Sequence, residues 1–154
     1  MLIFGSAAAE LASAGKIYGV DPHTGQRLWV FDVIKKDPES RPEEEAAKYG
    51  GGGAWLPGSY DAETDAVFYG TSNPAADAWG EDRKGDNLYT GTVLALEPRT
   101  GKLKWYRQEI EHDLWDFDSA YEFPPNQPER QGPNRSPEQE RLRVRHGQAR
   151  RQGS

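Results

Sequence analysis

The chain of 154 residues contains no cysteine, which excludes a disulfide scaffold and any metal site built from thiolates. Long apolar runs are also missing: no stretch of about 18 apolar residues occurs, so we expect no membrane-spanning helix. Basic residues are fewer than acidic ones, 19 against 25, and the net charge of −6 argues against a nucleic-acid-binding surface. No Lys or Arg precedes the short apolar start, which predicts a strand over residues 2–4 and no signal peptide.

The apolar residues that remain are distributed unevenly. Residues 2–121 hold nearly all the aromatic and β-branched residues, whereas residues 122–154 hold one Phe, one Val, one Leu and no Ile. We therefore expect a folded region over residues 1–121 and a tail over residues 122–154 whose composition is typical of disorder. A second interpretation rests on the codons that could encode residues 138–152. When these codons are read in a frame shifted by one nucleotide, they can encode the strand and glycine turn of a further repeat. A frameshifted or truncated gene is favoured here over a functional tail.

A strand–turn–strand unit occurs twice. Residues 17–31 contain a β-rich run, an acidic residue, a Pro-His-Thr-Gly turn and a second run with Trp29. Residues 93–106 repeat this order with a Pro-Arg-Thr-Gly turn and Trp105. The last glycine supplies the positive φ that such a hairpin turn needs, and the flanking runs alternate like half-buried strands. Residues 59–70 predict a third hairpin.

These repeated units predict an all-β fold, either a propeller or a sandwich. Helical periodicity is nearly absent, and only residues 42–48 look weakly helical. Two long loops, at residues 35–54 and 73–88, interrupt the strands. Loops of this length in a repeat fold usually build a site, although a plain surface insertion is the alternative.

The densest group of reactive side chains is the segment Glu-His-Asp-Leu-Trp-Asp-Phe-Asp at residues 111–118. Residues i and i+2 of an extended segment point the same way, so Asp116 and Asp118 are predicted to project from one face beside two aromatic rings. Two close carboxylates repel each other unless a cation neutralises them, and hard cations prefer such oxygen ligands. The alternative interpretation is a solvated acidic turn.

Three further residues are candidates for a site. Asn73 ends a β-rich run just before a proline, where an amide side chain can be presented. Glu10 is a lone carboxylate among small residues; it is either a ligand or a helix-start residue, and its spacing alone favours the second. Trp55 closely follows four glycines, and close backbone approach beside a large flat ring suits a planar ligand. An ordinary core tryptophan fits that pattern equally well.

Eight short segments, in order and in register, resemble the methanol and ethanol dehydrogenase family that depends on pyrroloquinoline quinone (PQQ). They are Gly-Ser-Ala-Ala-Ala-Glu (5–10), Tyr-Gly-Val-Asp-Pro-His-Thr-Gly-x-x-Leu-Trp (18–29), Gly-Gly-Gly-Ala-Trp (51–55), Gly-Ser-Tyr-Asp (58–61), Tyr-Gly-Thr-Ser-Asn-Pro-Ala (69–75), Gly-Asp-Asn-Leu-Tyr-Thr (85–90), Thr-Gly-Lys-Leu-Lys-Trp (100–105) and His-Asp-Leu-Trp-Asp-Phe-Asp (112–118). The resemblance implies a partial β-propeller, two to three blades of an eight-bladed quinoprotein propeller, with long site loops. PQQ and a metal ion lie at the axis of such a propeller.

The resemblance also assigns metal ligands and a base. It implies that Glu10, Asn73 and Asp116 bind the metal ion, and that Asp116 also takes the proton of the alcohol. Asp118 resembles the additional aspartate of lanthanide-using members, where calcium-using members have a small residue. A trivalent ion favours one more negative oxygen ligand than Ca²⁺ needs. The implied metal is therefore Ca²⁺ or a lanthanide ion, and Asp118 favours the lanthanide.

For PQQ, the resemblance implies that Trp55 forms the floor under the cofactor ring and that Ala7, Ala8 and Ala9 lie beside it. Two departures from the family pattern concern this part of the site. Ala7 offers no hydroxyl to PQQ where family members have a serine, and Gly53 stands where the family often has a threonine. We expect PQQ to bind more weakly than is usual in the family.

The implied reaction is oxidation of a small primary alcohol by hydride transfer to PQQ, in the periplasm, with cytochrome c as electron acceptor. The resemblance covers roughly a quarter of a full family chain, and two or three isolated blades expose unpaired strand edges, so we expect the fragment alone to be poorly stable and inactive. One alternative is a non-catalytic PQQ-repeat propeller that binds other proteins; it explains the repeats but not the joint presence of the candidate ligands. Another is an inactive truncated gene product.

Overall fold

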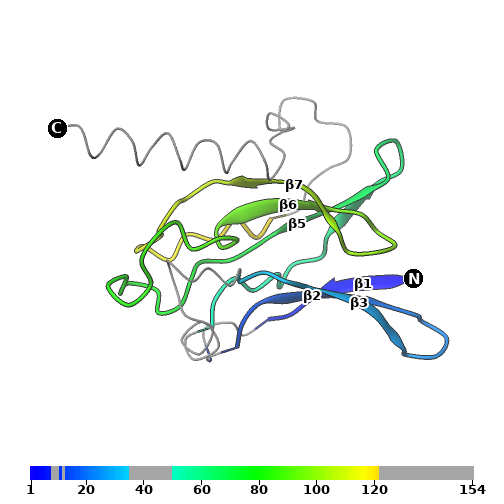
Figure 1. Ribbon diagram of the computed structural model, residues 1–154, viewed down its shortest axis with the longest axis horizontal. Coiled ribbons are helices and arrows are strands. Elements are labelled where there is room, and N and C mark those ends of the chain that lie inside the picture. Colours follow the sequence, from blue (N-terminus) through cyan, green and yellow to red (C-terminus); the bar gives the residue numbers. More distant parts are fainter. Residues whose placement is uncertain (8–10, 12, 35–49, 122–154) are drawn as a thin grey trace.

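The computed structural model describes residues 1–7, 11, 13–34 and 50–121, and all strands in these ranges belong to two antiparallel sheets (Figure 1). The first sheet has the order β1-β2-β3, with β1 (Leu2–Gly5), β2 (Lys16–Val20) and β3 (Arg27–Asp32). The second has the order β4-β5-β6-β7, with β4 (Ser59–Asp61), β5 (Ala66–Gly70), β6 (Thr92–Leu96) and β7 (Leu103–Gln108). The all-β prediction is confirmed, together with the strand at the start of the chain and the three hairpins.

Some expectations concern other parts of the chain. The weakly helical stretch at residues 42–48 and the tail at residues 122–154 lie outside the described residues. In the described ranges, the chain forms no helix that is long and apolar enough to cross a membrane.

The two repeats fold into hairpins with the same turn geometry. In each turn, the amides of the acidic residue (Asp21 or Glu97) and of the glycine (Gly25 or Gly101) donate across the turn at 2.8–2.9 Å. Both glycines have a positive φ, of 71° and 68°, as the sequence predicts. The turn is therefore encoded locally, by four residues that recur in the same order.

The third hairpin closes through a different local device. The Asp61 carboxylate accepts hydrogen bonds from the Thr64 hydroxyl at 2.6 Å and from the Glu63 amide at 3.1 Å. These bonds, the one from Thr64 first, hold the pKa of Asp61 below its usual value. The Nζ of Lys104 donates to the carbonyls of Thr64 and Asp65 at 2.7 and 3.0 Å, so β7 supports this turn from the neighbouring hairpin.

The core lies between the two sheets. Its buried members are Ile17, Trp29, Val33, Ala54, Val67, Tyr69, Tyr89, Leu94 and Leu96. Two side chains also make polar contacts from one sheet to the other: the Trp29 Nε1 donates to the Pro98 carbonyl at 2.9 Å, and the Tyr69 hydroxyl donates to the Ile3 carbonyl at 3.0 Å. The sheets are thus joined by both apolar packing and two directed hydrogen bonds.

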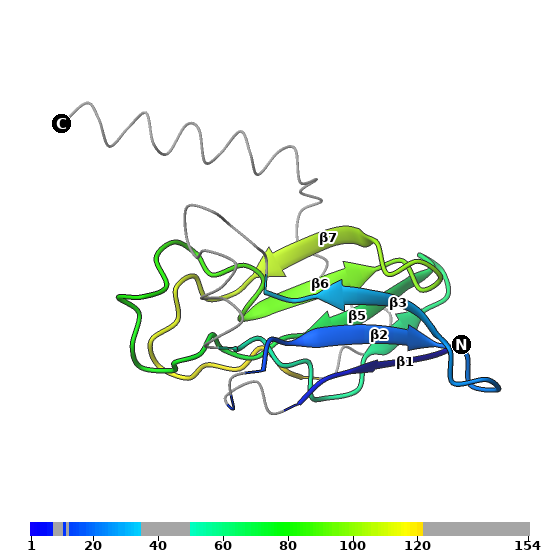
Figure 2. The ribbon, with the colours of Figure 1, turned by 60° about the horizontal axis from the view of Figure 1, so that its bottom comes forward.

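The two ends of the sheets differ in what they carry (Figures 1 and 2). The three hairpin turns, at residues 22–25, 62–65 and 98–101, lie together at what we call the turn end. Two long segments, at residues 73–88 and 109–121, lie together at the opposite end, which we call the loop end. The candidate ligands Asn73, Asp116 and Asp118 all belong to the loop end.

Candidate functional site

Asn73 lies at the loop end, three residues after β5 ends. Its side chain is buried, with 2% of its surface exposed. The amide nitrogen donates to Asp77 Oδ1 at 2.8 Å and to the Pro74 carbonyl at 3.3 Å. The sequence correctly predicted an amide at the end of a strand, and the structure shows that this amide is held in one orientation.

Asp118 lies beside Asn73, although the two are 45 positions apart along the chain. The backbone amide of Asn73 donates to Asp118 Oδ1 at 3.4 Å. The structure therefore brings together two of the predicted ligand residues, one amide and one carboxylate, whose oxygens suit a hard cation. Across the described residues, no three acidic or histidine side chains gather closely enough to hold an ion by themselves. The predicted ligand Glu10 lies outside the described residues.

The extended backbone expected around Asp116 and Asp118 is wrong, because the segment is curled. The buried Asp113 carboxylate accepts hydrogen bonds from the amides of Trp115 at 2.8 Å and Phe117 at 2.7 Å. Asp116 lies between these two amides with a φ of 62°, a left-handed conformation that aspartate tolerates better than most residues. The alternation of side chains that holds for an extended strand does not hold here.

Two aromatic side chains flank the exposed Asp116. Trp115 and Phe117 are 66% and 52% exposed, and their ring centroids lie 6.4 Å apart. Asp116 is thus an exposed carboxylate between two exposed aromatic residues along the chain. Such a segment offers a proton acceptor next to apolar surface that a ligand can contact.

Arg83 is central to the loop end, and sequence reasoning missed it. Its side chain is 1% exposed, and the guanidinium donates hydrogen bonds mainly to backbone carbonyls. The acceptors are Trp79 O (3.0 Å), Ala76 O (3.2 Å), Asp77 O (3.2 Å), Asp113 O (2.5 Å) and Asn87 Oδ1 (2.6 Å). Arg83 thereby ties the 73–88 loop to the turn that carries Asp116. A single arginine in a polar loop gives no sequence signal of this role, because it looks like an ordinary solvated residue.

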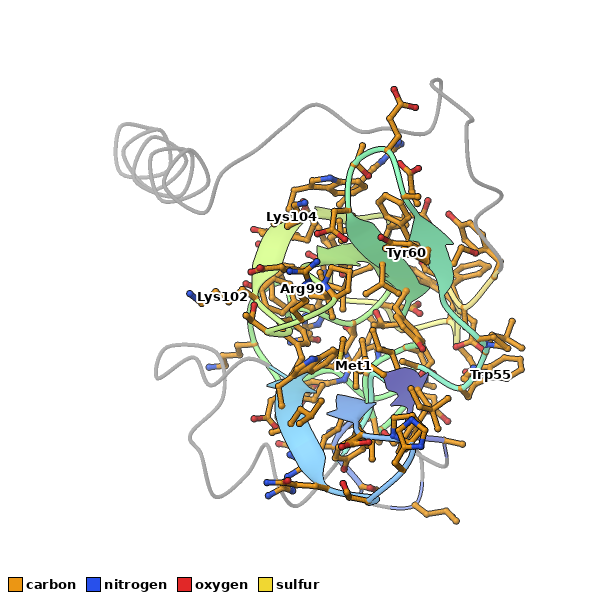
Figure 3. All side chains as sticks on the ribbon, turned by 90° about the vertical axis from the view of Figure 1, so that its right-hand side faces the viewer. Met1, Trp55, Tyr60, Arg99, Lys102 and Lys104 are labelled. Carbon is orange, nitrogen blue, oxygen red and sulfur yellow. The ribbon has the colours of Figure 1, made fainter. Side chains whose placement is uncertain are left out.

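The glycines before Trp55 serve the packing of the protein itself. A Cβ on Gly51 would lie 2.5 Å from the Ala75 amide nitrogen, and the Gly52 amide donates to the Asn73 carbonyl at 2.8 Å. Trp55 is 48% exposed, so the core-tryptophan interpretation is wrong. Figure 3, which faces the turn end, shows Trp55 at the edge of the molecule on the side away from Lys102.

The remaining predicted PQQ residues are described only in part. Ala7 is exposed, whereas Ala8 and Ala9 lie outside the described residues. Next to Asn73, the hydroxyl of Ser72 is the one buried side-chain polar atom in the described part of the chain that has no hydrogen-bond partner. Such a group costs about 1–3 kcal/mol, so it is a natural point for a ligand to bind.

Comparison with known proteins identifies relatives for most of the chain. Residues 2–128 match the model of the family described as "glucose/ethanol/alcohol dehydrogenase, beta-propeller domain". The chain is 39% identical to quinoprotein glucose dehydrogenase of Escherichia coli over 108 residues, which are 69% of this chain and 14% of the relative. It is 38% identical to quinoprotein alcohol dehydrogenase PedH of Pseudomonas putida over 142 residues, covering 79% of this chain and 24% of the relative.

Solved structures give the same result. The fold is similar to quinohemoprotein alcohol dehydrogenase from Comamonas testosteroni, with a TM-score of 0.67 and 32% identity over 78% of this chain and 20% of that one. It is also similar to a europium-containing methanol dehydrogenase, with a TM-score of 0.68 and 30% identity over 76% of this chain and 24% of that one. These similarities confirm the predicted fold, a part of a quinoprotein β-propeller.

Proposed function

The chain belongs to the family of β-propeller domains of glucose, ethanol and alcohol dehydrogenases, and from this we propose that it carries the metal-binding part of a PQQ-dependent alcohol dehydrogenase. The observation that supports the proposal most directly is the 3.4 Å hydrogen bond from the Asn73 backbone amide to the Asp118 carboxylate. It brings together two residues that carry oxygen donors on distant segments of the loop end, where the family resemblance expects a metal ion.

In this proposal, the cation is held by Asn73, Asp116 and Asp118, and Glu10 completes the set from the N-terminal segment. All four residues offer oxygen, the donor that Ca²⁺ and lanthanide ions prefer. The three carboxylates together carry enough negative charge to balance a trivalent ion, so Asp118 favours a lanthanide over Ca²⁺. The structural similarity to a europium-containing methanol dehydrogenase supports this choice.

We place PQQ against Trp55 and beside Ala7, Ala8 and Ala9. Two observations fit this placement. Trp55 is 48% exposed and is not buried in the core, so a flat ligand can cover its ring. The buried Ser72 hydroxyl has a hydrogen bond left to make, next to Asn73. When bound, PQQ supplies the electron chemistry by accepting a hydride from the alcohol carbon.

Asp116 is the proposed base. Its carboxylate accepts the hydroxyl proton of a small primary alcohol, while the exposed rings of Trp115 and Phe117 contact the alkyl part of the substrate and exclude water. The hydrogen bonds that the two flanking amides donate to the Asp113 carboxylate present Asp116 at the point of the turn. By resemblance, the electron acceptor is a cytochrome c and the reaction takes place in the periplasm.

The test is a titration of the chain with PQQ in the presence of Ca²⁺ or La³⁺, followed by quinone absorbance. We expect La³⁺ to support binding at a concentration about tenfold lower than Ca²⁺, because it gains more from Asp118. Asp118→Ala should remove most of this preference, whereas Asp86→Ala, which removes an exposed carboxylate of the same loop end, should not. Equal affinities for the two ions contradict the lanthanide assignment, and absence of PQQ binding with either ion contradicts the proposal.

A sugar is the second candidate substrate, and one observation favours it. A relative named quinoprotein glucose dehydrogenase is 39% identical to this chain. Because we expect the chain alone to be inactive, ethanol and glucose are compared by binding: each is titrated into the protein loaded with PQQ and La³⁺, and the quinone absorbance is followed. Tighter binding of glucose would replace the alcohol assignment while leaving the metal site in place.

A further inference from the structure

We infer that Asp77 is a positioning residue that fixes the orientation of the Asn73 side chain, so that the amide oxygen, and not the nitrogen, faces the cation. The inference rests on the proposed metal site. It concerns a residue that none of the matching motifs includes, and it starts from the 2.8 Å hydrogen bond between Asn73 Nδ2 and Asp77 Oδ1.

The orientation follows from hydrogen-bond chemistry. An amide side chain has nearly the same shape after a half-turn about its last bond, so packing alone barely distinguishes oxygen from nitrogen. An ionised carboxylate can only accept, so the group of Asn73 that faces Asp77 must be the NH₂. The second amide hydrogen is directed to the Pro74 carbonyl at 3.3 Å, which again requires nitrogen on that side. The Asn73 oxygen is therefore left on the opposite side.

Burial makes this orientation matter. Asn73 is 2% exposed, so bulk water has little access to compensate an amide that has turned the wrong way. A turned amide would direct its NH₂ toward the bound cation and would lose a ligand oxygen. A residue that holds a ligand in place in this way typically contributes about 10–100-fold in metal affinity.

Asp77 is itself held in place. The Arg83 guanidinium, which is 1% exposed, donates to the backbone carbonyls of Ala76 and Asp77, both at 3.2 Å. Three residues separate Asp77 from Asn73, and this short loop is fixed at both of its ends, by β5 and by Arg83. The carboxylate is thus a built partner of the amide and not a surface side chain that meets it by chance.

The variant that tests the inference is Asp77→Asn, which keeps the shape but lets either amide orientation form a hydrogen bond. Asp82→Asn is the matched control, because Asp82 is an exposed carboxylate of the same loop that accepts a hydrogen bond from the Trp79 indole at 3.2 Å. Asn73→Asp combined with Asp77→Asn exchanges the two groups at constant net charge. In this double variant, an oxygen faces the cation whichever way the residue turns.

The first readout needs no metal. In the native chain, the Asn73 side-chain NH₂ should give a resolved, slowly exchanging pair of amide signals in a ¹⁵N NMR spectrum. Asp77→Asn should speed this exchange at least about tenfold, and Asp82→Asn should leave it unchanged. Equal exchange in the native chain and in Asp77→Asn overturns the inference.

The second readout is a titration with Tb³⁺ alone, followed by its luminescence. Asp77→Asn should weaken binding about 10–100-fold, Asp82→Asn less than threefold, and the exchanged double variant should recover most of the affinity. If Asp82→Asn loses as much Tb³⁺ affinity as Asp77→Asn does, net charge explains both losses and the inference is overturned. The inference is also overturned if the double variant binds Tb³⁺ as weakly as Asp77→Asn does. If Tb³⁺ binding is the same in the native chain and in Asp118→Asn, the proposed metal site fails and the inference fails with it. If binding depends on Asp118 but not on Asp77, only the inference fails.

Discussion

The turn end and the loop end of the molecule are stabilised in different ways. At the turn end, each hairpin closes through hydrogen bonds between residues at most five positions apart, such as those of Asp21 and Glu97. At the loop end, the buried Arg83 joins five acceptors, one of which lies 30 positions away at Asp113. A change at the turn end should therefore act on one hairpin, whereas a change at Arg83 should act on the whole candidate site.

The turn end has two long-range exceptions: the bonds from Lys104 to the 62–65 turn, and the contact between Trp29 and the second repeat. Trp29 donates to the Pro98 carbonyl across the two sheets, and its ring lies against Gly101. Its equivalent in the second repeat, Trp105, is half-buried and contacts Phe68 with 5.7 Å between the ring centroids. The same sequence position thus connects the sheets in one repeat and packs within a single sheet in the other.

The largest predicted effect comes from removing the contact between Trp29 and the second repeat. Trp29→Ala should lower the free energy of unfolding by about 3–5 kcal/mol, because it removes a buried indole between the sheets and leaves the Pro98 carbonyl without its donor. Trp105→Ala should cost roughly half as much, since that ring is half-buried. Urea denaturation followed by circular dichroism measures both. Equal losses would show that Trp29 does not join the sheets.

The next largest effect concerns the loop end. Arg83→Met should cost about 3 kcal/mol, because several buried carbonyls lose their donor at once. Its distinguishing result is local: hydrogen exchange at the Trp115 and Phe117 amides should become faster than at the hairpin turns. Arg107→Met, at an exposed position on β7, is the control and should stay within about 0.5 kcal/mol of the native chain. Faster exchange spread evenly over both ends would contradict the division into two ends.

These contrasts explain how much the sequence could predict. The strands and turns follow from alternation and from Thr-Gly pairs, which act between near neighbours, so they were predicted correctly. Asn73 was identified as a candidate because a strand end and a following proline are local signals. The backbone around Asp116 was wrongly predicted to be extended, because the Asp113 carboxylate curls the segment. The role of Arg83 depends on where distant carbonyls lie in space, which spacing along the chain does not reveal.

A smaller effect on the free energy of unfolding comes from replacing the turn glycines, and it separates backbone strain within a turn from contact with Trp29. Gly25 and Gly101 hold equivalent positions with φ of 71° and 68°, so alanine at either position has the same backbone strain, about 1–2 kcal/mol. A Cβ on Gly25 meets nothing within 4 Å, whereas a Cβ on Gly101 would lie 2.4 Å from Trp29 Cε3. Gly101→Ala should therefore cost about 1–3 kcal/mol more than Gly25→Ala in the same urea measurement. Combining Gly101→Ala with Trp29→Ala should remove this difference, and its persistence would mean that the strain lies elsewhere.

The smallest effect tests the second polar contact between the sheets. Tyr69→Phe removes the hydrogen bond to the Ile3 carbonyl and should cost about 1 kcal/mol at pH 7. Burial raises the pKa of Tyr69 above the usual value of 10.0, so the unfolded chain loses this proton at a lower pH than the folded chain does. The stability that Tyr69 contributes is therefore fully present below pH 10 and is lost as the pH rises from there toward the folded-state pKa.

Urea midpoints measured between pH 8 and pH 11 should consequently fall less steeply in Tyr69→Phe than in the native chain. Tyr18→Phe, in which the lost hydroxyl belongs to a ring that packs on Phe4, provides the control for removing a phenol from the first sheet. If the urea midpoint falls with pH at the same rate in the native chain and in Tyr69→Phe, the Tyr69 hydroxyl is not desolvated between the sheets. Of the two side-chain hydrogen bonds between the sheets, the one from Trp29 would then be the one that contributes to stability.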